Sequence, residues 1–414
     1  MRRNQSLQQV LNLIRKKSPI GQAEISRALG ISLPMVMQGV RRLRDYGWIR
    51  EAGKGQSTGG KPPVLLEFAS DAYYSVGVEL DPERILVVLM DGKGELSRQE
   101  AACLFTRGPV PTLERLRRLI TQVLNKVSFD PGKLLGIGVA APGWFDPVSQ
   151  RLIHAPLFGW RDVDFLTPLG QWFQTHVCVG NHIRATACGE KIFGAAREAH
   201  TYLCVHLGWG IGGALVLADR LYTGESGSAG ELGHSLAVPG GPLCNCGKRG
   251  CLEAVASEQA ILRDAREKLA DGQPSSLGKP GGGTVGELSL RKILTAAAQG
   301  DPLAKDLLEN AQDRLGAAIA DAINLLDPEL VILDGSLVRN RFFPVGLRQA
   351  IDRHRLPLAG TKTRITLSQL GADAPAIGAA AMVMKQVLEE DFQGWQSGLS
   401  LEKQASQPAS LARH

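Results

Sequence analysis

A histidine and three cysteines lie within the eighteen residues from 234 to 251, and this cluster constrains the folded chain more than any other sequence feature. The four residues are His234, Cys244, Cys246 and Cys251, and the glycines between them allow the sharp bends that would bring the side chains onto one ion. Three thiolates and one imidazole match the ligand set of a tetrahedral structural zinc site. Free buried thiols or a redox pair are the alternatives, but Cys-x-Cys is a poor redox spacing. The sequence therefore predicts one structural Zn²⁺ ion per chain.

Two carboxylates bracket this cluster. Glu231 lies three residues before His234, and Glu253 lies two residues after Cys251. Fixed acceptors of this kind suit the hydroxyl groups of a sugar, although each carboxylate taken alone could be a solvated surface group.

Composition excludes several classes of protein. The chain is 44% hydrophobic and 21% charged, and no apolar run approaches the ~20 residues that cross a bilayer. The N-terminus leads into an amphipathic pattern rather than the apolar stretch of a signal peptide. Seven cysteines, three of them packed between 244 and 251, do not form an extracellular disulfide framework. We therefore expect a cytoplasmic protein that has no membrane partner.

The positive charge of the chain is concentrated at one end. Residues 1 to 66 contain 12 Lys and Arg against 3 Asp and Glu, a net charge of +9, whereas the remaining 348 residues carry 35 and 38, or −3. A basic module joined to a near-neutral body is typical of a nucleic-acid-binding arm, although a solvated basic face has the same composition.

Periodicity in the basic segment favours DNA binding. A first helix carries apolar residues at helical spacing, a second short helix ends at Gly30, and Ser32 caps a third helix expected over 32 to 46. The apolar stripes are Leu7, Val10, Leu11 and Ile14 in the first helix and Val36, Val40 and Leu43 in the third. In a helix-turn-helix of this arrangement the second helix of the pair lies in the major groove.

The residues after the third helix predict a wing. A β-hairpin is expected from Trp48 to Leu66, with a glycine-rich tip that includes Lys61. Glutamine suits bidentate hydrogen bonds to adenine, arginine suits guanine, and a lysine at the tip suits phosphates or the minor groove. We predict a homodimer, or a dimer of dimers, that binds double-stranded operator DNA through Ser32, Gln38, Arg41, Arg42 and Lys61. A three-helix module that docks another protein is the alternative.

From Tyr74 the pattern changes to strands joined by tight turns. Strands are expected over 74 to 80, 85 to 90, 134 to 141, 202 to 207, 214 to 217 and 330 to 334, and helices over 113 to 127, 315 to 326 and 376 to 388. A strand hairpin followed by a helix indicates the core of an actin-like α/β domain. No internal sequence repeat is visible.

Several of these motifs together resemble the ROK family of sugar kinases and sugar-responsive repressors. The run from Leu207 to Leu217, the segment Ala229 to His234 and the cluster from Cys244 to Glu253 occur in the family's order. A winged helix with Gly59 to Pro63 in its wing resembles the family's repressor branch, which includes xylose and N-acetylglucosamine repressors.

The resemblance implies an N-terminal winged helix-turn-helix and an α/β actin-like (ribonuclease H-like) body of two subdomains. It implies a monosaccharide effector in the cleft between the subdomains, held by Gly143, Asn181, Glu231, His234 and Glu253, with His234 also a zinc ligand beside Cys244, Cys246 and Cys251. The implied function is a DNA-binding regulator that represses carbohydrate-utilisation genes and has no kinase activity. The alternatives are an ATP-dependent sugar kinase that carries a DNA-binding domain and a sugar-binding scaffold that docks another protein.

Three departures from the family's kinases favour the repressor. The kinases begin the body with an Asp-x-Gly-Gly-Thr phosphate loop, whereas this chain has Glu79 to Arg84, which removes backbone donors and adds negative charge. The kinases carry Asn-Asp with the aspartate as general base, whereas Asn181 is followed by His182. Trp209 replaces the threonine of the second phosphate loop, and we expect its bulk to fill the phosphate space.

These patterns divide the chain into four parts. They are a winged helix over 1 to 66, a first subdomain over 71 to 180 with about 376 to 391, a second subdomain over 181 to 375 with the zinc site and dimer contacts, and a polar tail over 392 to 414. Within the second subdomain, 271 to 284 is expected to form a loop between helices.

Overall fold

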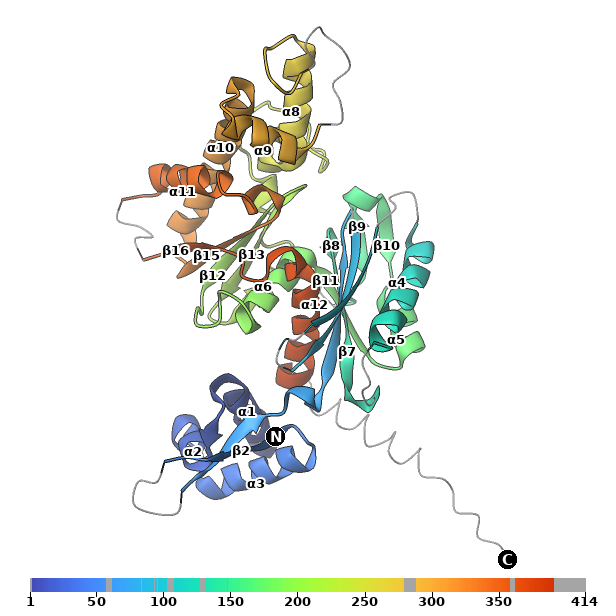
Figure 1. The fold of residues 1–414 in the computed structure, drawn as a ribbon, viewed down its shortest axis with the longest axis vertical. Helices are drawn as coiled ribbons and strands as arrows, with labels where there is room; N and C mark the ends of the chain where they lie inside the picture. Colours follow the sequence, from blue (N-terminus) through green and yellow to red (C-terminus); the bar gives the residue numbers. More distant parts are fainter. Residues whose placement is uncertain are drawn as a thin grey trace, which may run out of the picture. The chain divides into compact units, whose positions relative to one another are not determined.

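The computed structural model describes residues 2–56, 62–82, 84–92, 94, 96–102, 108–126, 131–146, 148–278, 288–357 and 362–390 (Figure 1). The chain forms two compact units. The first comprises Met1–Ala141, Val163–Gly180 and Ala379–His414, and the second comprises Pro142–Asp162 and Asn181–Gly378. Lys61, the end of the predicted loop at 279 to 284 and the predicted tail lie outside the described residues.

The N-terminal part of the first unit is a winged helix whose apolar residues converge on one core. Its elements are α1 (Arg2–Lys17), β1 (Ile20–Gly21), α2 (Gln22–Leu29), α3 (Leu33–Asp45), β2 (Ile49–Lys54) and β3 (Val64–Phe68), with the sheet order β1-β3-β2. All seven residues of the two predicted apolar stripes are buried. Gly30 ends α2 in the left-handed conformation, and β2 pairs with β3 in an antiparallel hairpin. The predicted helix-turn-helix and the base of its wing are confirmed.

The rest of the first unit is built on a five-stranded sheet of order β11-β7-β4-β5-β6. The strands are β4 (Tyr74–Leu80), β5 (Arg84–Asp91), β6 (Leu96–Ala102), β7 (Leu134–Ala141) and β11 (His176–Asn181). The hairpins from β4 to β6 are antiparallel, whereas β4 pairs with β7 in parallel. Helices α4 (Pro109–Leu124) and α5 (Leu166–Phe173) cover one face of this sheet, and the end of α12 (Ala374–Lys385) packs on β7 (Figure 1). A Cβ at Gly138 would overlap the carbonyl oxygen of Ala379, so only glycine permits this packing.

The second unit is built on the five-stranded sheet β14-β13-β12-β15-β16. When the strands of each sheet are numbered in chain order, both sheets have the order 3-2-1-4-5. The strands are β12 (Tyr202–Leu207), β13 (Ile211–Leu217), β14 (Arg220–Tyr222), β15 (Leu330–Asp334) and β16 (Arg364–Leu367). Because side chains alternate along a strand, Leu203 and Val205 of β12 enter a helical core on one face. Tyr202 and Cys204 pack toward α6 (His182–Ile192) on the other face. The α/β body of two related halves is confirmed.

Helices of the second unit form a layer over that first face. They are α7 (Leu252–Ala256), α8 (Glu258–Ala270), α9 (Leu290–Ala298), α10 (Pro302–Leu326) and α11 (Phe343–His354). The helix predicted over 315 to 326 is only the C-terminal half of α10. Its start is set by Asp301, whose side chain accepts a hydrogen bond from the Ala304 N–H (2.9 Å) just before Pro302. A small sheet that the sequence patterns did not predict is made of β8 (Trp144–Phe145), β9 (Leu152–Ala155) and β10 (Trp160–Val163).

Candidate functional site

The exposed face of α3 carries the predicted DNA-reading residues. Gln38, Arg41 and Arg42 are all exposed, opposite the buried stripe that packs on α1. Ser32 occupies the N-cap position, as expected, but within the described residues its side chain makes no capping hydrogen bond. A proline in the first turn stabilises the start of the helix instead. The predicted cap is therefore right in position and wrong in its interaction.

The four predicted metal ligands lie together in the second unit. Their ligand atoms are all within 4.8 Å of one another. The Nδ1 atom of His234 lies 3.6 Å from the Sγ atom of Cys244. The Sγ atoms of Cys246 and Cys251 are 3.7 Å apart, far beyond the ~2.05 Å of a disulfide bond. The cluster has the composition and size to hold a metal ion.

The loop from Glu231 to His234 is fixed by glycine contacts with β13. A Cβ at Gly230 would overlap the carbonyl oxygen of Gly213, and one at Gly233 would overlap that of Ile211. The close approach also allows the Gly213 N–H to donate a hydrogen bond to the Gly230 carbonyl (2.8 Å). Glycine at these two positions therefore sets where the carboxylate and the imidazole of the loop lie.

His234 connects the metal-ligand cluster to the first carboxylate. While its Nδ1 atom faces Cys244, its Nε2 atom lies 3.7 Å from the Oε2 atom of Glu231. Burial raises the pKa of Glu231, and the nearby His234 ring partly opposes that shift. A metal-bound histidine commonly donates its other N–H to a carboxylate, which fixes its tautomer and orientation. One ring nitrogen of His234 therefore lies toward Cys244, and the other lies toward Glu231.

Asn181 and Gly143 are joined by a hydrogen bond. Asn181 caps α6 by accepting from the Ile183 N–H (2.9 Å), and its Nδ2 atom donates to the Gly143 carbonyl (3.0 Å). Gly143 has a φ of +130°, and a Cβ there would lie 2.6 Å from the His154 carbonyl oxygen. Only glycine fits this position, which belongs to the second unit together with Asn181.

Glu253 holds the glycine turn between β12 and β13. It lies in the first turn of α7, and its Oε2 atom accepts a hydrogen bond from the Ile211 N–H (2.9 Å). A Cβ at Gly210 would lie 2.8 Å from the same oxygen. This hydrogen bond fixes the direction of the Glu253 carboxylate. All five predicted sugar residues lie in the second unit.

Trp144 is a residue of this region that the sequence analysis missed. Its ring stacks on His154 and on His234, with centroid distances of 5.7 and 6.0 Å. Its side chain also hydrogen-bonds Glu231. A tryptophan directly after Gly143 is a signal that the sequence did offer, because aromatic side chains commonly line ligand sites.

Arg184 is a second residue that the sequence analysis missed. From α6 it donates hydrogen bonds to the carbonyls of Gly227 (2.5 Å) and Ala229 (3.1 Å), which ties α6 to the segment before Glu231. No motif predicts this role, since the partners are backbone atoms brought close by the fold.

At the three positions where the sequence differs from the family's kinases, the side chains contact other parts of this chain. At the β4–β5 turn, Arg84 lies 2.7 Å from the Oε2 atom of Glu79, which is only 7% exposed. The ring of His182 meets that of His206 edge-on, with centroids 5.1 Å apart. Trp209 is half-buried against the helical core of the second unit.

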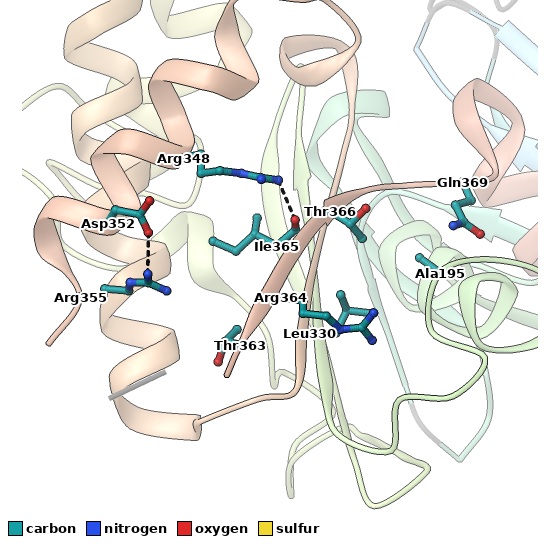
Figure 2. Close-up of a pocket in the computed structure, with 10 residues that line it drawn as sticks. All are labelled: Ala195, Leu330, Arg348, Asp352, Arg355, Thr363, Arg364, Ile365, Thr366 and Gln369. Atoms are coloured by element: carbon teal, nitrogen blue, oxygen red, sulfur yellow. Dashed lines mark hydrogen bonds and ion pairs between the residues drawn. The ribbon is translucent and has the colours of Figure 1, made fainter. Parts of the chain in front are cut away.

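A pocket of about 530 Å³ lies elsewhere in the second unit, beside β16 and α11 (Figure 2). Arg348 donates to the Ile365 carbonyl (2.7 Å), and Arg355 pairs with Asp352 (3.0 Å). Two of the three guanidinium groups that line the pocket are thus engaged within its wall, and Arg364 is the third. None of the predicted sugar or metal residues is among the residues that line it.

No helix in the described part of the chain has the length and apolar character that a transmembrane segment requires.

Known proteins resemble the chain over nearly its whole length. A model of the ROK family matches residues 75–386, and a model of winged helix-turn-helix DNA-binding domains matches residues 3–50. The xylose repressor of Bacillus subtilis (strain 168) is 31% identical, over 93% of this chain and 96% of its own. The N-acetylglucosamine repressor of Escherichia coli O157:H7 is 27% identical, over 92% of each chain.

A solved structure supports the same assignment. It is the crystal structure of a ROK family transcriptional regulator, a homologue of the E. coli MLC protein, and its TM-score is 0.80 at 26% identity. The match covers 97% of this chain and 99% of that one, so it includes the DNA-binding part as well as the body. The chain therefore belongs to the ROK family, and within it to the branch of DNA-binding transcriptional repressors.

Proposed function

We propose that the chain represses carbohydrate-utilisation genes as a homodimer, and that a bound monosaccharide changes its affinity for operator DNA. The sugar is held by Gly143, Asn181, Glu231, His234 and Glu253. The observation that carries the proposal is the position of His234, whose two nitrogens face a metal-ligand cluster and a carboxylate suited to sugar hydroxyls. Xylose and N-acetylglucosamine, after which two relatives are named, are the first candidate effectors.

Zinc is the metal that fits the cluster of His234, Cys244, Cys246 and Cys251. With Zn–S bonds of about 2.3 Å, Zn–N bonds of about 2.0 Å and tetrahedral angles, two sulfurs lie about 3.8 Å apart and a sulfur and a nitrogen about 3.5 Å apart. One sulfur–sulfur separation is 3.7 Å and one sulfur–nitrogen separation is 3.6 Å, and all four ligand atoms lie within 4.8 Å of one another. Four protein ligands fill a tetrahedral site, so the ion would be structural and would fix the loop that carries Glu231.

The sugar residues would act as acceptors in fixed positions. Glu253 uses one carboxylate oxygen for the Ile211 N–H and keeps lone pairs for a hydroxyl group. Glu231 is held beside Trp144 and His234, so its carboxylate need not be ordered when the sugar arrives. Hydrogen bonds to such charged acceptors are stronger than those between neutral groups.

Helix α12 offers a physical route from the sugar residues to the DNA-binding domain. Its first residues belong to the second unit, where a Cβ at Gly378 would overlap the Ala185 carbonyl of α6, the helix that Asn181 caps. Its later residues belong to the first unit and continue into a π-helical turn, η7 (Gln386–Glu390). There Gln8 of α1 donates a hydrogen bond to the Leu388 carbonyl (2.8 Å). A displacement of α6 on sugar binding would therefore reach α1 through one continuous helix.

DNA binding is assigned to the exposed residues of α3 and to the wing. Ser32, Gln38, Arg41 and Arg42 would contact the major groove and its phosphates, and Lys61 would add a contact from the wing. In a symmetric dimer these contacts would repeat in two half-sites about one or two helical turns apart.

The test uses the full-length protein and DNA from upstream of its own gene. A panel of monosaccharides is first screened by thermal shift, because a ligand at 100 times its dissociation constant adds about 2.7 kcal/mol of stability. Gel shifts with and without the hit should then differ about 5- to 150-fold in operator affinity. A chain that binds this DNA equally well after deletion of residues 1 to 66, or whose affinity no sugar changes, would contradict the proposal.

A further inference from the structure

The exposed face of α3 carries apolar side chains that the predicted DNA contacts do not use. Met37 is 53% exposed, and Leu33, one helical turn earlier, is 42% exposed. Every exposed large apolar side chain that the structure describes before residue 69 lies on α3 or, as Tyr46, at its C-cap. Single exposed apolar residues are ordinary, but a group of them on one helix marks a surface that contacts a partner.

Met37 lies beside one of the polar residues assigned to DNA. Arg41 follows one helical turn later, whereas Gln38, the next residue in the sequence, lies ~100° around the helix. Because residues four apart share a helix face, Leu33, Met37 and Arg41 form one edge of the exposed surface. Met35 lies on the other edge, since two residues rotate the helix by ~200°.

The chemistry around Met37 favours a nucleic-acid base over a protein as its partner. Its edge is shared with the guanidinium group of Arg41, and a guanidinium group matches the acceptors on the major-groove edge of guanine. The C5-methyl group of thymine is the apolar group that the major groove presents, and a thioether is flexible and polarisable enough to pack against it.

We propose that Met37 reads the 5-methyl group of one thymine in each operator half-site, beside the base pair that Arg41 contacts. The inference rests on the proposed entry of α3 into the major groove. It adds an apolar specificity contact to the polar ones, and it makes the repressor sensitive to a methyl group rather than to a hydrogen-bond pattern.

The experiment removes the methyl groups from the DNA, so it does not depend on whether a variant folds. An operator is first selected from random-sequence duplexes with the full-length protein in the absence of sugar. Each symmetric pair of thymines is then replaced by deoxyuridine, and affinity is measured by fluorescence anisotropy. One pair is expected to lower the affinity about 15-fold, because each buried methyl group contributes about a fourfold change.

Two variants of the protein show which side chain causes the loss of affinity on uracil replacement. In Met37→Ala the loss at that thymine pair should fall to less than twofold, while in the matched control Met35→Ala it should remain. Insensitivity of the unaltered protein to every uracil replacement would overturn the inference while leaving the proposed function intact. A loss that persists in Met37→Ala, or disappears only in Met35→Ala, would overturn the assignment to Met37. Failure to select any operator would overturn the proposed function and this inference with it.

Discussion

The predicted sugar residues (the sugar side) and the β4–β5 turn from Glu79 to Arg84 (the phosphate side) are held in different ways. Glu253 and Asn181 are fixed by backbone N–H groups, so each keeps a set direction and has acceptor capacity left over. At the turn where the family's kinases place ATP phosphates, Arg84 and Glu79 satisfy each other instead. The first set therefore keeps acceptors for the proposed sugar, whereas at the β4–β5 turn a carboxylate and a guanidinium group pair with each other. Under the proposed function, the body keeps a sugar site and lacks phosphate transfer.

The largest expected effect is at the proposed zinc site, because we propose that the ion fixes the loop that carries Glu231. Cys246→Ser removes one of four ligands, so we expect zinc content to fall from one equivalent per chain to near zero. A structural zinc ion contributes about 10–16 kcal/mol to small domains, so we expect its loss to lower the melting temperature of this larger fold by more than about 10 °C. Elemental analysis and calorimetry measure the two effects.

The matched control for the metal prediction is Cys188→Ser. Cys188 lies on α6, outside the cluster, so its replacement should leave a full zinc equivalent. If Cys246→Ser also kept a full equivalent and an unchanged melting temperature, the cluster would be no zinc site.

The next effect is at the carboxylate that His234 faces. Glu231→Ala removes a charged acceptor, so we expect the dissociation constant for the sugar to rise about 10- to 150-fold, since a hydrogen bond to a charged group contributes about 1.5–3 kcal/mol. Operator affinity without sugar should stay unchanged. Titration of sugar into the repressor–operator complex measures both quantities. Glu225→Ala, which removes an exposed carboxylate from the preceding loop, is the control and should respond normally.

The sequence predicted the elements whose signals are local. The apolar stripes of α1 and α3, the ranges of β4, β7, β12 and β15, and the proximity of the four candidate metal ligands all depend on spacing within a short segment. It did not predict that both sheets share one strand order, because topology can repeat without sequence repeat. The interaction of Arg184 with two carbonyls was equally hidden, since those atoms come together only in the folded chain.

A smaller effect is expected at Arg184, which holds the segment before Glu231 and which we expect to affect the proposed sugar site without touching the sugar. Arg184→Met removes two hydrogen bonds to the segment before Glu231, so we expect sugar affinity to fall about tenfold. Arg184→Lys, which keeps a charged nitrogen with N–H donors, should recover part of that loss. A merely structural role would lower the melting temperature of both variants while sugar affinity, measured well below that temperature, stayed unchanged.

The last prediction is that a variant gains no kinase activity, and it tests the β4–β5 turn and the residue after Asn181. His182→Asp restores the kinase-type Asn-Asp pair, yet we expect no sugar phosphorylation with ATP and magnesium in a coupled assay. A general base contributes about 10²–10⁴-fold, whereas phosphate transfer depends mainly on donors and cations that position and neutralise the phosphates. Glu79 and Asp81 present carboxylates there, and the one cation at this turn, Arg84, is paired with Glu79 in the part of the chain that the structure describes. Phosphorylation by His182→Asp would therefore show that the β4–β5 turn still admits ATP, and the contrast between the two sides would fail.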